Sequence, residues 1–421
     1  MTSRLTRLRE AWRYGRPGAG PVDGESLTEW GPRFEDARRV LRRACAVAIV
    51  VALLAGTGAF AVAHRVQSSS DDAARRRLDA VTQTLEAFVA HARGRDFQHP
   101  VTVQLESDTE FAHHTGGTAS MRSFLVALYP MYQALGLSTG PSDPTSIATE
   151  LSGLEDGYYE FGTGIVHVRG TAITPYVKRV LVHELTHALD DQWFDLDSIQ
   201  RSKDRRFILL APNALIEGDA ERIEGEYLDS LSTDERIRAV PPPGASALEN
   251  VPRELLETLT FPYRYGAEFV RAVAANGGES AVDNAFRDPP YFGAEILHPD
   301  LYLDSAQQTS IADAEKALAL PDADAGALTK SEVFGWDEYT TRVVLEKVLG
   351  PAAAAEAASA WHGALDIEWS TVNETCVRVV FADPADPTDH RLPDALRTWA
   401  AQQPDAVLTT APLTLRACAA T

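Results

Sequence analysis

The feature that most constrains this chain is a His-Glu-x-x-His sequence at residues 183–187. It lies inside an apolar run over 180–189 whose only acidic or basic residues are those of the motif itself. The run predicts a helix, and residues four apart lie on one face of a helix, one turn from each other. His183 and His187 are therefore spaced to bind a single Zn²⁺ at about 2.0–2.1 Å from each ring nitrogen. Glu184 then has the position of a general base that takes a proton from the attacking water.

Two incidental histidines on a solvated amphipathic helix would produce the same sequence motif. The rest of the run argues against that interpretation. Val182, Leu185 and Leu189 form an apolar face, so the helix can bury its back while it presents both histidines to a cleft. We therefore expect a helix built to carry a metal site.

A second acidic segment, over 213–227, is predicted to be a helix that completes this site. Catalytic zinc usually has three protein ligands and one open position. Glu217, thirty residues after His187, is the expected third ligand for one zinc ion per chain. Glu221 and Asp191, each one turn beyond a ligand, are candidates for orienting a ligand histidine through its other ring nitrogen. For these two residues a solvated acidic face remains an equal alternative.

This arrangement resembles the gluzincin group of zinc metallopeptidases, whose third ligand is a glutamate on a second helix. The match consists of His183, Glu184, His187 and a Glu-Gly-x-Ala sequence at 217–220. The resemblance implies an α+β, zincin-like fold, in which a small sheet with an edge strand accompanies the two ligand-bearing helices. It also implies hydrolysis of peptide bonds in a protein or peptide substrate.

The order of the later segments is similar to that of a largely uncharacterised set of bacterial zincin-like, membrane-anchored proteins. Three segments carry this likeness: Phe-Pro-Tyr-x-x-Gly-x-x-Phe-Val at 261–270, Gly-Gly with Ala-Val-Asp at 277–283, and Leu-His-Pro at 297–299. The chain departs from the pattern at 292–295, where Phe-Gly-Ala-Glu replaces a Ser/Thr-Thr-Glu-Gln type of sequence. The resemblance covers residues 150–305.

A residue that stabilises the oxyanion of hydrolysis is harder to identify from sequence. Such a site usually needs a Tyr or His donor besides the metal. Tyr263, Tyr265 and His298 are the polar residues of the resembling region that fit this requirement. His298 is the first choice, and with Glu184 it forms the expected catalytic set. For each of the three, a structural role in a half-buried position is the alternative.

An uncharged stretch over 44–63 is long enough to cross a bilayer as a helix. Four arginines within 38–43 precede it, and the positive-inside rule then places residues 1–43 in the cytoplasm as a tail. We expect a single-pass protein of the cell membrane with its catalytic domain outside the cytoplasm. A cleaved signal peptide is the alternative, because Ala-Val-Ala at 61–63 resembles a cleavage site, but the leader and the apolar run are both too long for one.

The part beyond the membrane is expected to have three segments. Residues 64–98 form a stalk or a first helix, 99–310 the zincin-like catalytic domain, and 311–421 an α+β portion that either continues this domain or is appended to it. A strand over 101–105 and a hairpin over 158–168 precede the motif helix. An exposed edge of that hairpin suits pairing with an extended peptide.

The cysteines and the net charge limit compartment and partners. Cys45 lies in the apolar stretch, which leaves Cys376 and Cys418 either to form one disulfide in an oxidising compartment or to remain buried thiols. The net charge is −21 although residues 1–43 are net basic. A chain with this net negative charge repels nucleic acid. Its charge also makes protein substrates more favourable than anionic polymers.

These observations predict a membrane-anchored zinc metallopeptidase. One alternative is a catalytically silent zincin-like domain that binds envelope proteins or peptides and does not need Glu184. Another is an envelope structural protein without metal, in which the histidine pair is accidental. Replacement of His187 separates this last alternative from the other two, because it abolishes metal binding only where a metal site exists.

Overall fold

The computed structural model describes residues 72–114, 117–138, 144–153, 155–200, 210–241, 251–331 and 336–420. The expected cytoplasmic tail and membrane span lie outside these residues. Among the residues described, no helix combines the length and the apolar character that a membrane crossing requires. Residues 77–421 form one compact unit, which contains both the candidate site and the C-terminal portion.

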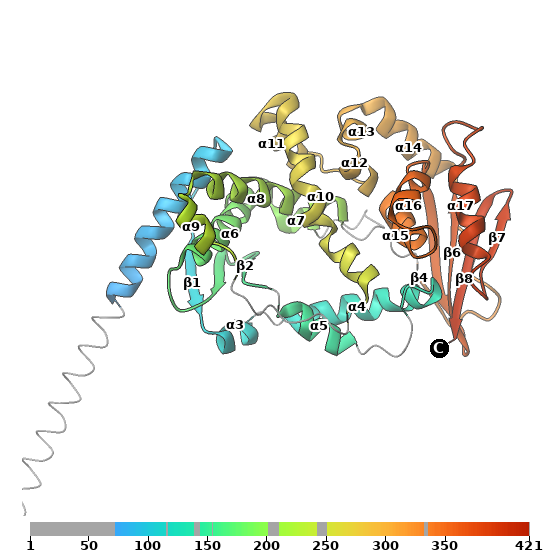
Figure 1. Ribbon diagram of the computed structural model, residues 1–421, viewed down its shortest axis with the longest axis horizontal. Helices are drawn as coiled ribbons and strands as arrows, with labels where there is room; N and C mark the ends of the chain where they lie inside the picture. Colours follow the sequence, from blue (N-terminus) through green and yellow to red (C-terminus); the bar gives the residue numbers. More distant parts are fainter. Residues whose placement is uncertain are drawn as a thin grey trace, which may run out of the picture. The chain divides into compact units, whose positions relative to one another are not determined.

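The fold is α+β and contains two separate sheets (Figure 1). The first sheet has the strand order β1-β3-β2, formed by β1 (Thr102–Glu106), β2 (Gly157–Glu160) and β3 (Ile165–Arg169). β1 runs parallel to β3, and β2 pairs antiparallel with β3. The hairpin predicted from the sequence is thus confirmed, and β2 is an edge strand of this sheet.

Two long helices pack beside the first sheet. α6 (Pro175–Phe194) begins at Thr174, whose side chain accepts a hydrogen bond from the backbone N–H of Val177. A threonine N-cap followed by proline is a favourable helix start. α8 (Leu210–Ser230) lies against α6, and apolar residues of both helices join β3 in one buried cluster.

The helix over 72–93 belongs to the same buried cluster. Its Leu85 and Val89 are at most 4% exposed and pack with residues of α6. From residue 77 onwards this helix is part of the compact unit.

α8 also crosses α10 (Arg253–Gly277) at very short range. A Cβ atom added to Gly218 would lie 2.2 Å from the carbonyl carbon of Gly266. Only glycine allows two backbones to approach this closely. The glycine that follows Glu217 is therefore required by packing, which also holds α10 beside the candidate site.

The second sheet is antiparallel throughout, with the strand order β4-β5-β6-β8-β7. Cys376 on β6 pairs directly with Cys418 on β8, and the two are joined by a disulfide. α4 and α17 contact this sheet, and its apolar residues join those of the surrounding helices in the largest buried cluster. The strands are β4 (Thr329–Ser331), β5 (Ala364–Ser370), β6 (Glu374–Phe381), β7 (Val407–Thr410) and β8 (Leu413–Ala420).

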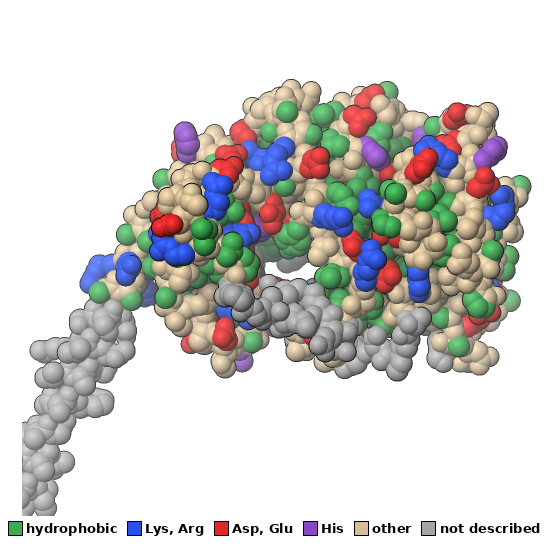
Figure 2. All heavy atoms as spheres, in the orientation of Figure 1, with side chains coloured by type: hydrophobic (Ala, Val, Ile, Leu, Met, Phe, Trp, Pro, Cys, Tyr) green, Lys and Arg blue, Asp and Glu red, His purple; other side chains and the backbone are tan. Residues whose placement is uncertain are grey.

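Shorter helices fill the space around the two sheets (Figure 1). On the face shown in Figure 2, Lys and Arg side chains lie interspersed with Asp and Glu and form no broad basic patch. The helices are α3 (Asp108–His114), α4 (Gly117–Ala134), α5 (Pro144–Ser152), α7 (Leu196–Gln200), α9 (Thr233–Arg238), α11 (Glu279–Arg287), α12 (Gly293–Leu297), α13 (Pro299–Leu303), α14 (Ser305–Ala317), α15 (Glu338–Leu349), α16 (Pro351–Ala358) and α17 (Arg391–Ala400).

Candidate metal centre

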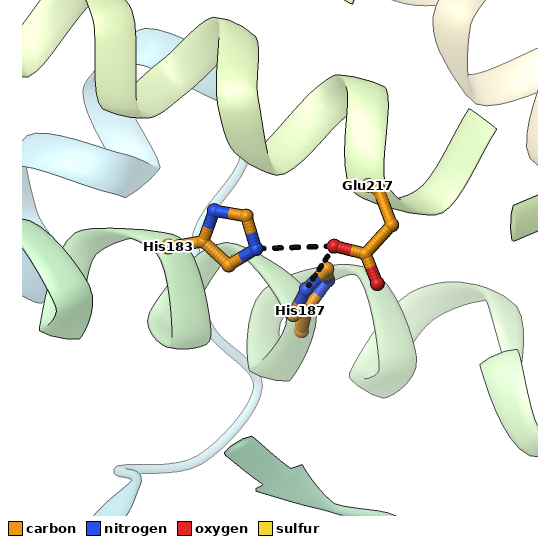
Figure 3. Close-up of side chains that lie close together, drawn as sticks. All are labelled: His183, His187 and Glu217. Carbon is orange, nitrogen blue, oxygen red and sulfur yellow. Dashed lines mark hydrogen bonds and ion pairs between the residues drawn. The ribbon is translucent and has the colours of Figure 1, made fainter. Parts of the chain in front are cut away.

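Three predicted ligands meet where α6 and α8 pack together (Figure 3). Oε2 of Glu217 lies 3.1 Å from Nε2 of His183 and 3.4 Å from Nε2 of His187. Tetrahedral zinc with bonds of about 2.0–2.1 Å places neighbouring ligand atoms about 3.3 Å apart. These two distances and the His₂Glu donor set therefore fit a zinc ion.

The charges of this cluster are strongly coupled. Burial acts to lower the pKa of His183, yet its hydrogen bonds to Glu217 and Glu224 raise that pKa well above the ordinary value. Burial acts to raise the pKa of Glu217, but the two histidines hold it far below its usual range. Glu217 is thus an ionised carboxylate with both imidazoles aimed at one oxygen, as a metal ligand has to be.

The residue that orients His183 is Glu224, not the predicted Glu221. Nδ1 of His183 lies 3.2 Å from Oε2 of Glu224, while its other ring nitrogen faces Glu217. Glu221 lies close to this pair, but both nitrogens of the ring are already occupied. Glu224 also accepts a hydrogen bond from Arg179. Burial acts to raise the pKa of Glu224, and His183 and Arg179 outweigh that effect, so it remains ionised.

Asp191 was also expected to orient a ligand histidine, and this prediction was wrong. Its carboxylate accepts hydrogen bonds from the hydroxyl of Tyr159 at 2.7 Å and from the backbone N–H of Leu196 at 2.9 Å. It therefore ties the end of α6 to β2. Nδ1 of His187 is buried and has no hydrogen-bond partner among the residues that the structure describes.

Glu184 lies where β2 passes in front of α6. Its side chain is buried and accepts a hydrogen bond from the backbone N–H of Tyr159 on β2. A Cβ atom on Gly157 would lie 3.1 Å from Oε1 of Glu184, so the glycine lets the strand approach the carboxylate. Burial raises the pKa of Glu184, although the two histidines oppose this shift. A carboxyl whose pKa is raised toward neutrality is suited to both accept and return a proton.

A cavity of about 460 Å³ opens beside His183 and Glu184. Leucines from α5 and α10 contribute apolar wall, and Glu155 and Glu221 contribute acidic groups. Burial raises the pKa of both carboxyls. The lining therefore combines apolar wall with several carboxylates next to the candidate metal cluster, and such a concave surface is a candidate ligand site.

Tyr263 on α10 stands at this cavity. Its hydroxyl hydrogen-bonds the carboxylate of Glu217, and the charge of Glu217, followed by burial, raises the pKa of the hydroxyl well above its ordinary value. The side chain as a whole is 49% exposed, so its phenol group reaches the site from the solvent side. Tyr263 therefore brings a hydroxyl to the carboxylate of Glu217 in the candidate metal cluster.

The first choice for this role, His298, was wrong. Its Nε2 lies 2.9 Å from Oε1 of Glu338, and it lines a separate cavity of about 490 Å³ that shares no lining residue with the one at Glu184. The hydrogen bond to Glu338 raises the pKa of His298. Tyr265 packs against the rings of Phe261 and Tyr339 and has a structural role.

Two features of the site were missed at the level of sequence. Glu224 follows Glu217 by seven residues and so lies on the same helix face two turns later. That spacing is a local signal from which Glu224 could have been predicted to lie near the ligands. Arg93 contacts Asp190 and Asp219, which lie close to the ligands in sequence. No local pattern links Arg93 to residues so far along the chain.

No protein-family model, no curated protein and no solved structure matches this chain.

Proposed function

We propose that this protein is a zinc-dependent metallopeptidase with a zincin-like catalytic region. The observation that carries the proposal is the convergence of His183, His187 and Glu217 on one point, with Glu184 and Tyr263 at the same cavity. A chance His-Glu-x-x-His helix has no reason to meet a carboxylate from another helix at ligand spacing. The three-ligand set also leaves a position open, as catalytic zinc sites do.

In this proposal His183, His187 and Glu217 hold the zinc ion. When bound, zinc acts as a Lewis acid toward the peptide carbonyl and makes water more acidic. Glu184 accepts one proton from the water whose oxygen bonds to the carbonyl carbon. It then gives this proton to the amine nitrogen as the C–N bond breaks. Glu224 holds His183 in the orientation that directs Nε2 to the metal.

Tyr263 is proposed to stabilise the oxyanion. Its hydroxyl is already directed into the cluster, where it donates to Glu217. Removal of a single donor of this kind typically lowers kcat by about 10²- to 10³-fold. Tyr263→Phe, which keeps the ring and removes only the hydroxyl, is expected to lower kcat by this factor while the KM and the zinc content change little. An unchanged kcat would remove Tyr263 from the mechanism.

Peptides are the favoured substrate class because of β2. It is an edge strand of its sheet, and the N–H of Tyr159 on it points at Glu184. An extended peptide that adds to such an edge gains backbone hydrogen bonds and runs past the reactive group. The mixed charges on the visible face give no support to a nucleic-acid partner (Figure 2).

The proposed location is the cell membrane, with residues 44–63 as the single anchor and the catalytic region outside the cytoplasm. The disulfide between Cys376 and Cys418 supports this location, because structural disulfides persist in oxidising compartments. Envelope proteins or peptides would then be the available substrates.

The test is the zinc content of the full chain, purified in detergent, beside Glu217→Ala and Glu184→Gln. We expect one zinc per chain in the wild type and in Glu184→Gln, and its loss in Glu217→Ala. If the well-folded wild type contains no zinc, even after zinc is added, the proposal of a zinc metallopeptidase is wrong.

Hydrolysis of a peptide library separates an enzyme from a silent binding domain. The wild type is expected to cleave, and Glu184→Gln is expected to retain zinc without cleavage, since an amide cannot accept the proton. Zinc binding without cleavage by the wild type would favour a domain that binds envelope proteins or peptides.

A further inference from the structure

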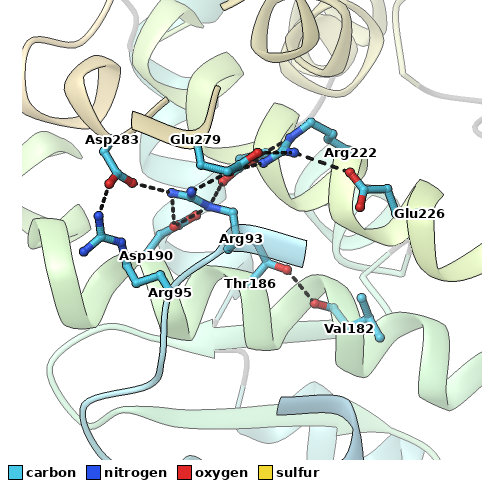
Figure 4. Close-up of polar contacts among 10 residues, drawn as sticks. Arg93, Arg95, Val182, Thr186, Asp190, Arg222, Glu226, Glu279 and Asp283 are labelled. Atoms are coloured by element: carbon cyan, nitrogen blue, oxygen red, sulfur yellow. Dashed lines mark hydrogen bonds and ion pairs between the residues drawn. The ribbon is translucent and has the colours of Figure 1, made fainter. Parts of the chain in front are cut away.

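A buried ionic cluster includes two aspartates that lie two and three residues from the candidate metal ligands in the sequence (Figure 4). At its centre is Arg93, the last residue of the helix over 72–93, with a fully buried side chain. The guanidinium contacts carboxylates from three different helices. The cluster consists of Arg93, Arg95, Asp190, Asp219, Arg222, Glu279 and Asp283.

Two of these contacts join the ligand-bearing helices. Nη2 of Arg93 lies 3.0 Å from Oδ1 of Asp190 on α6, and its Nε lies 2.6 Å from Oδ2 of Asp219 on α8. The side chains of both aspartates are 0% exposed. The contact with Asp190 is a charge-assisted hydrogen bond, which is short and directional, and the contact with Asp219 is a buried ion pair that lacks hydrogen-bond geometry. One planar group therefore fixes α6 and α8 to each other.

The two aspartates lie close to the metal ligands in sequence and flank the same helix interface. Asp190 follows His187 by three residues, and Asp219 follows Glu217 by two. At 3.6 residues per turn, Glu217 and Asp219 project about 200° apart on α8. Between them lie Ala220 and Ile223, which are fully buried, and Ile223 packs with residues of α6. The interface thus carries the metal ligands at one edge and the Arg93 contacts at the other.

Asp190 and Asp219 also hydrogen-bond each other across this interface, which requires a proton on one of the two carboxyls. When both are ionised they repel each other, and the charge of Arg93 offsets that repulsion. Buried like charges repel strongly because the surroundings screen them poorly. The rest of the cluster cannot replace Arg93: Arg222 contacts Asp219 and Glu279, and Arg95 contacts Asp283. Among the cations described, Arg93 alone touches both Asp190 and Asp219.

We propose that Arg93 is a positioning residue of the metal site: by clamping Asp190 of α6 to Asp219 of α8, it sets the spacing between His187 and Glu217. This inference rests on the proposed zinc site. The helix over 72–93 would then help to assemble the candidate zinc site, although the ligands of that site lie about a hundred residues later in the sequence. Lysine would keep the charge but would lose the planar fork that reaches both carboxylates.

The test measures zinc affinity of the full chain in detergent by competition with a chelator, for the wild type, Arg93→Lys and Arg93→Met. Loss of a residue that orients metal ligands typically weakens metal binding by about 10- to 100-fold. We expect weakening in this range for both variants, with Arg93→Lys the milder. If Arg93→Met does not fold, Arg93→Lys decides the question.

The control is Ile367→Ala, which opens a cavity beside the disulfide in the second sheet, far from Arg93 in the fold. It lowers thermal stability without a contact to α6 or α8 and is expected to keep the wild-type zinc affinity. Arg93→Lys and Arg93→Met with the zinc affinity of this control would overturn the proposal and leave Arg93 a purely structural residue.

A second arm separates failure of this inference from failure of the proposed function. If the wild type binds no zinc, the metallopeptidase proposal fails, and metal-free crystal structures of the wild type and Arg93→Lys decide the role of Arg93. Nε2 of His187 and Oε2 of Glu217 lie 3.4 Å apart. Lengthening beyond about 4 Å, the limit of an ion pair, supports the clamp, and an unchanged distance refutes it.

Discussion

Both sheets pack against their helices through apolar residues, and the two regions differ in what is added to that packing. Beside the three-stranded sheet, α6 and α8 meet through buried charges, with Arg93 between Asp190 and Asp219. The five-stranded sheet is closed by a disulfide and by large buried aromatic residues, among them Trp369 and Trp399. The first region carries the candidate site, and no candidate catalytic residue lies in the second.

The difference follows from what each interaction can do. Apolar burial contributes most of the stability of a fold but has no preferred direction. Buried ion pairs contribute little net stability, because desolvation offsets their attraction, yet their geometry is specific. A site that needs ligand atoms at set distances requires directional contacts. We therefore expect changes in the second sheet to alter stability alone, and changes between α6 and α8 to alter metal binding as well.

The largest effect on stability is expected from loss of the disulfide. Cys376 and Cys418 are separated by 42 residues, and closing a loop of this size stabilises a fold by about 4 kcal/mol in the chain-entropy model. The double variant Cys376→Ser/Cys418→Ser should lose this amount in denaturant unfolding while its zinc affinity stays at the wild-type value. A large fall in zinc affinity of the folded variant would show that the two regions are coupled.

Gly218→Ala should damage both properties. The new Cβ would lie 2.2 Å from backbone of Gly266, and overpacking of this kind costs about 3 kcal/mol. Because Gly218 follows Glu217, the shift of α8 should also weaken zinc binding.

Gly225→Ala on the same helix is the matched control. Its Cβ would meet only the end of Arg271, at 3.9 Å, so the better helix propensity of alanine should stabilise the protein by up to about 1 kcal/mol. Equal effects of the two variants on unfolding and zinc binding would contradict the packing argument.

A pH-dependent effect is expected in the second sheet. Burial, together with the nearby Asp366, raises the pKa of Glu368 to about 7 from its ordinary value of 4.5. Between these two values the native state binds more protons than the unfolded state, so stability falls as the pH rises through this window. Each pKa unit corresponds to about 1.4 kcal/mol.

Glu368→Gln removes the group that causes this loss. At pH 8 the variant is expected to be more stable than the wild type by up to about 3 kcal/mol, and below about pH 4 the gain should vanish. Urea unfolding at both pH values measures it. A gain of the same size at both would show that charge is not the cause.

The smallest effect concerns the orientation of His183. Glu224→Gln keeps the shape of the side chain and removes its charge. Loss of such a partner weakens metal binding by about 10- to 100-fold, or about 1.4–2.7 kcal/mol. Glu221→Gln in the same cavity is the control and should leave the zinc affinity nearly unchanged. If Glu221→Gln weakens zinc binding more than Glu224→Gln does, then Glu221 and not Glu224 is the residue that orients His183.

Several elements could be predicted from the sequence because their signals are local. The helices over 180–189 and 213–227, the strand over 101–105 and the hairpin over 158–168 were predicted from periodicity and turn residues, and all are present. β5 was not predicted, although Leu365, Ile367 and Trp369 alternate in it with polar residues. Its acidic side chains, Asp366 and Glu368, are buried, which runs against the usual pattern of an outward polar face.

By itself the sequence determined which residues form the candidate metal cluster, since helix geometry alone places His183 and His187 on one face. Only the tertiary structure decided which side chains surround that cluster. It selected Glu224 over Glu221 and Tyr263 over His298, and it brought Arg93 between two helices that follow about a hundred residues later. Spacing along one helix is fixed by the backbone, whereas contacts between elements depend on how their faces pack, and no local pattern contains that information.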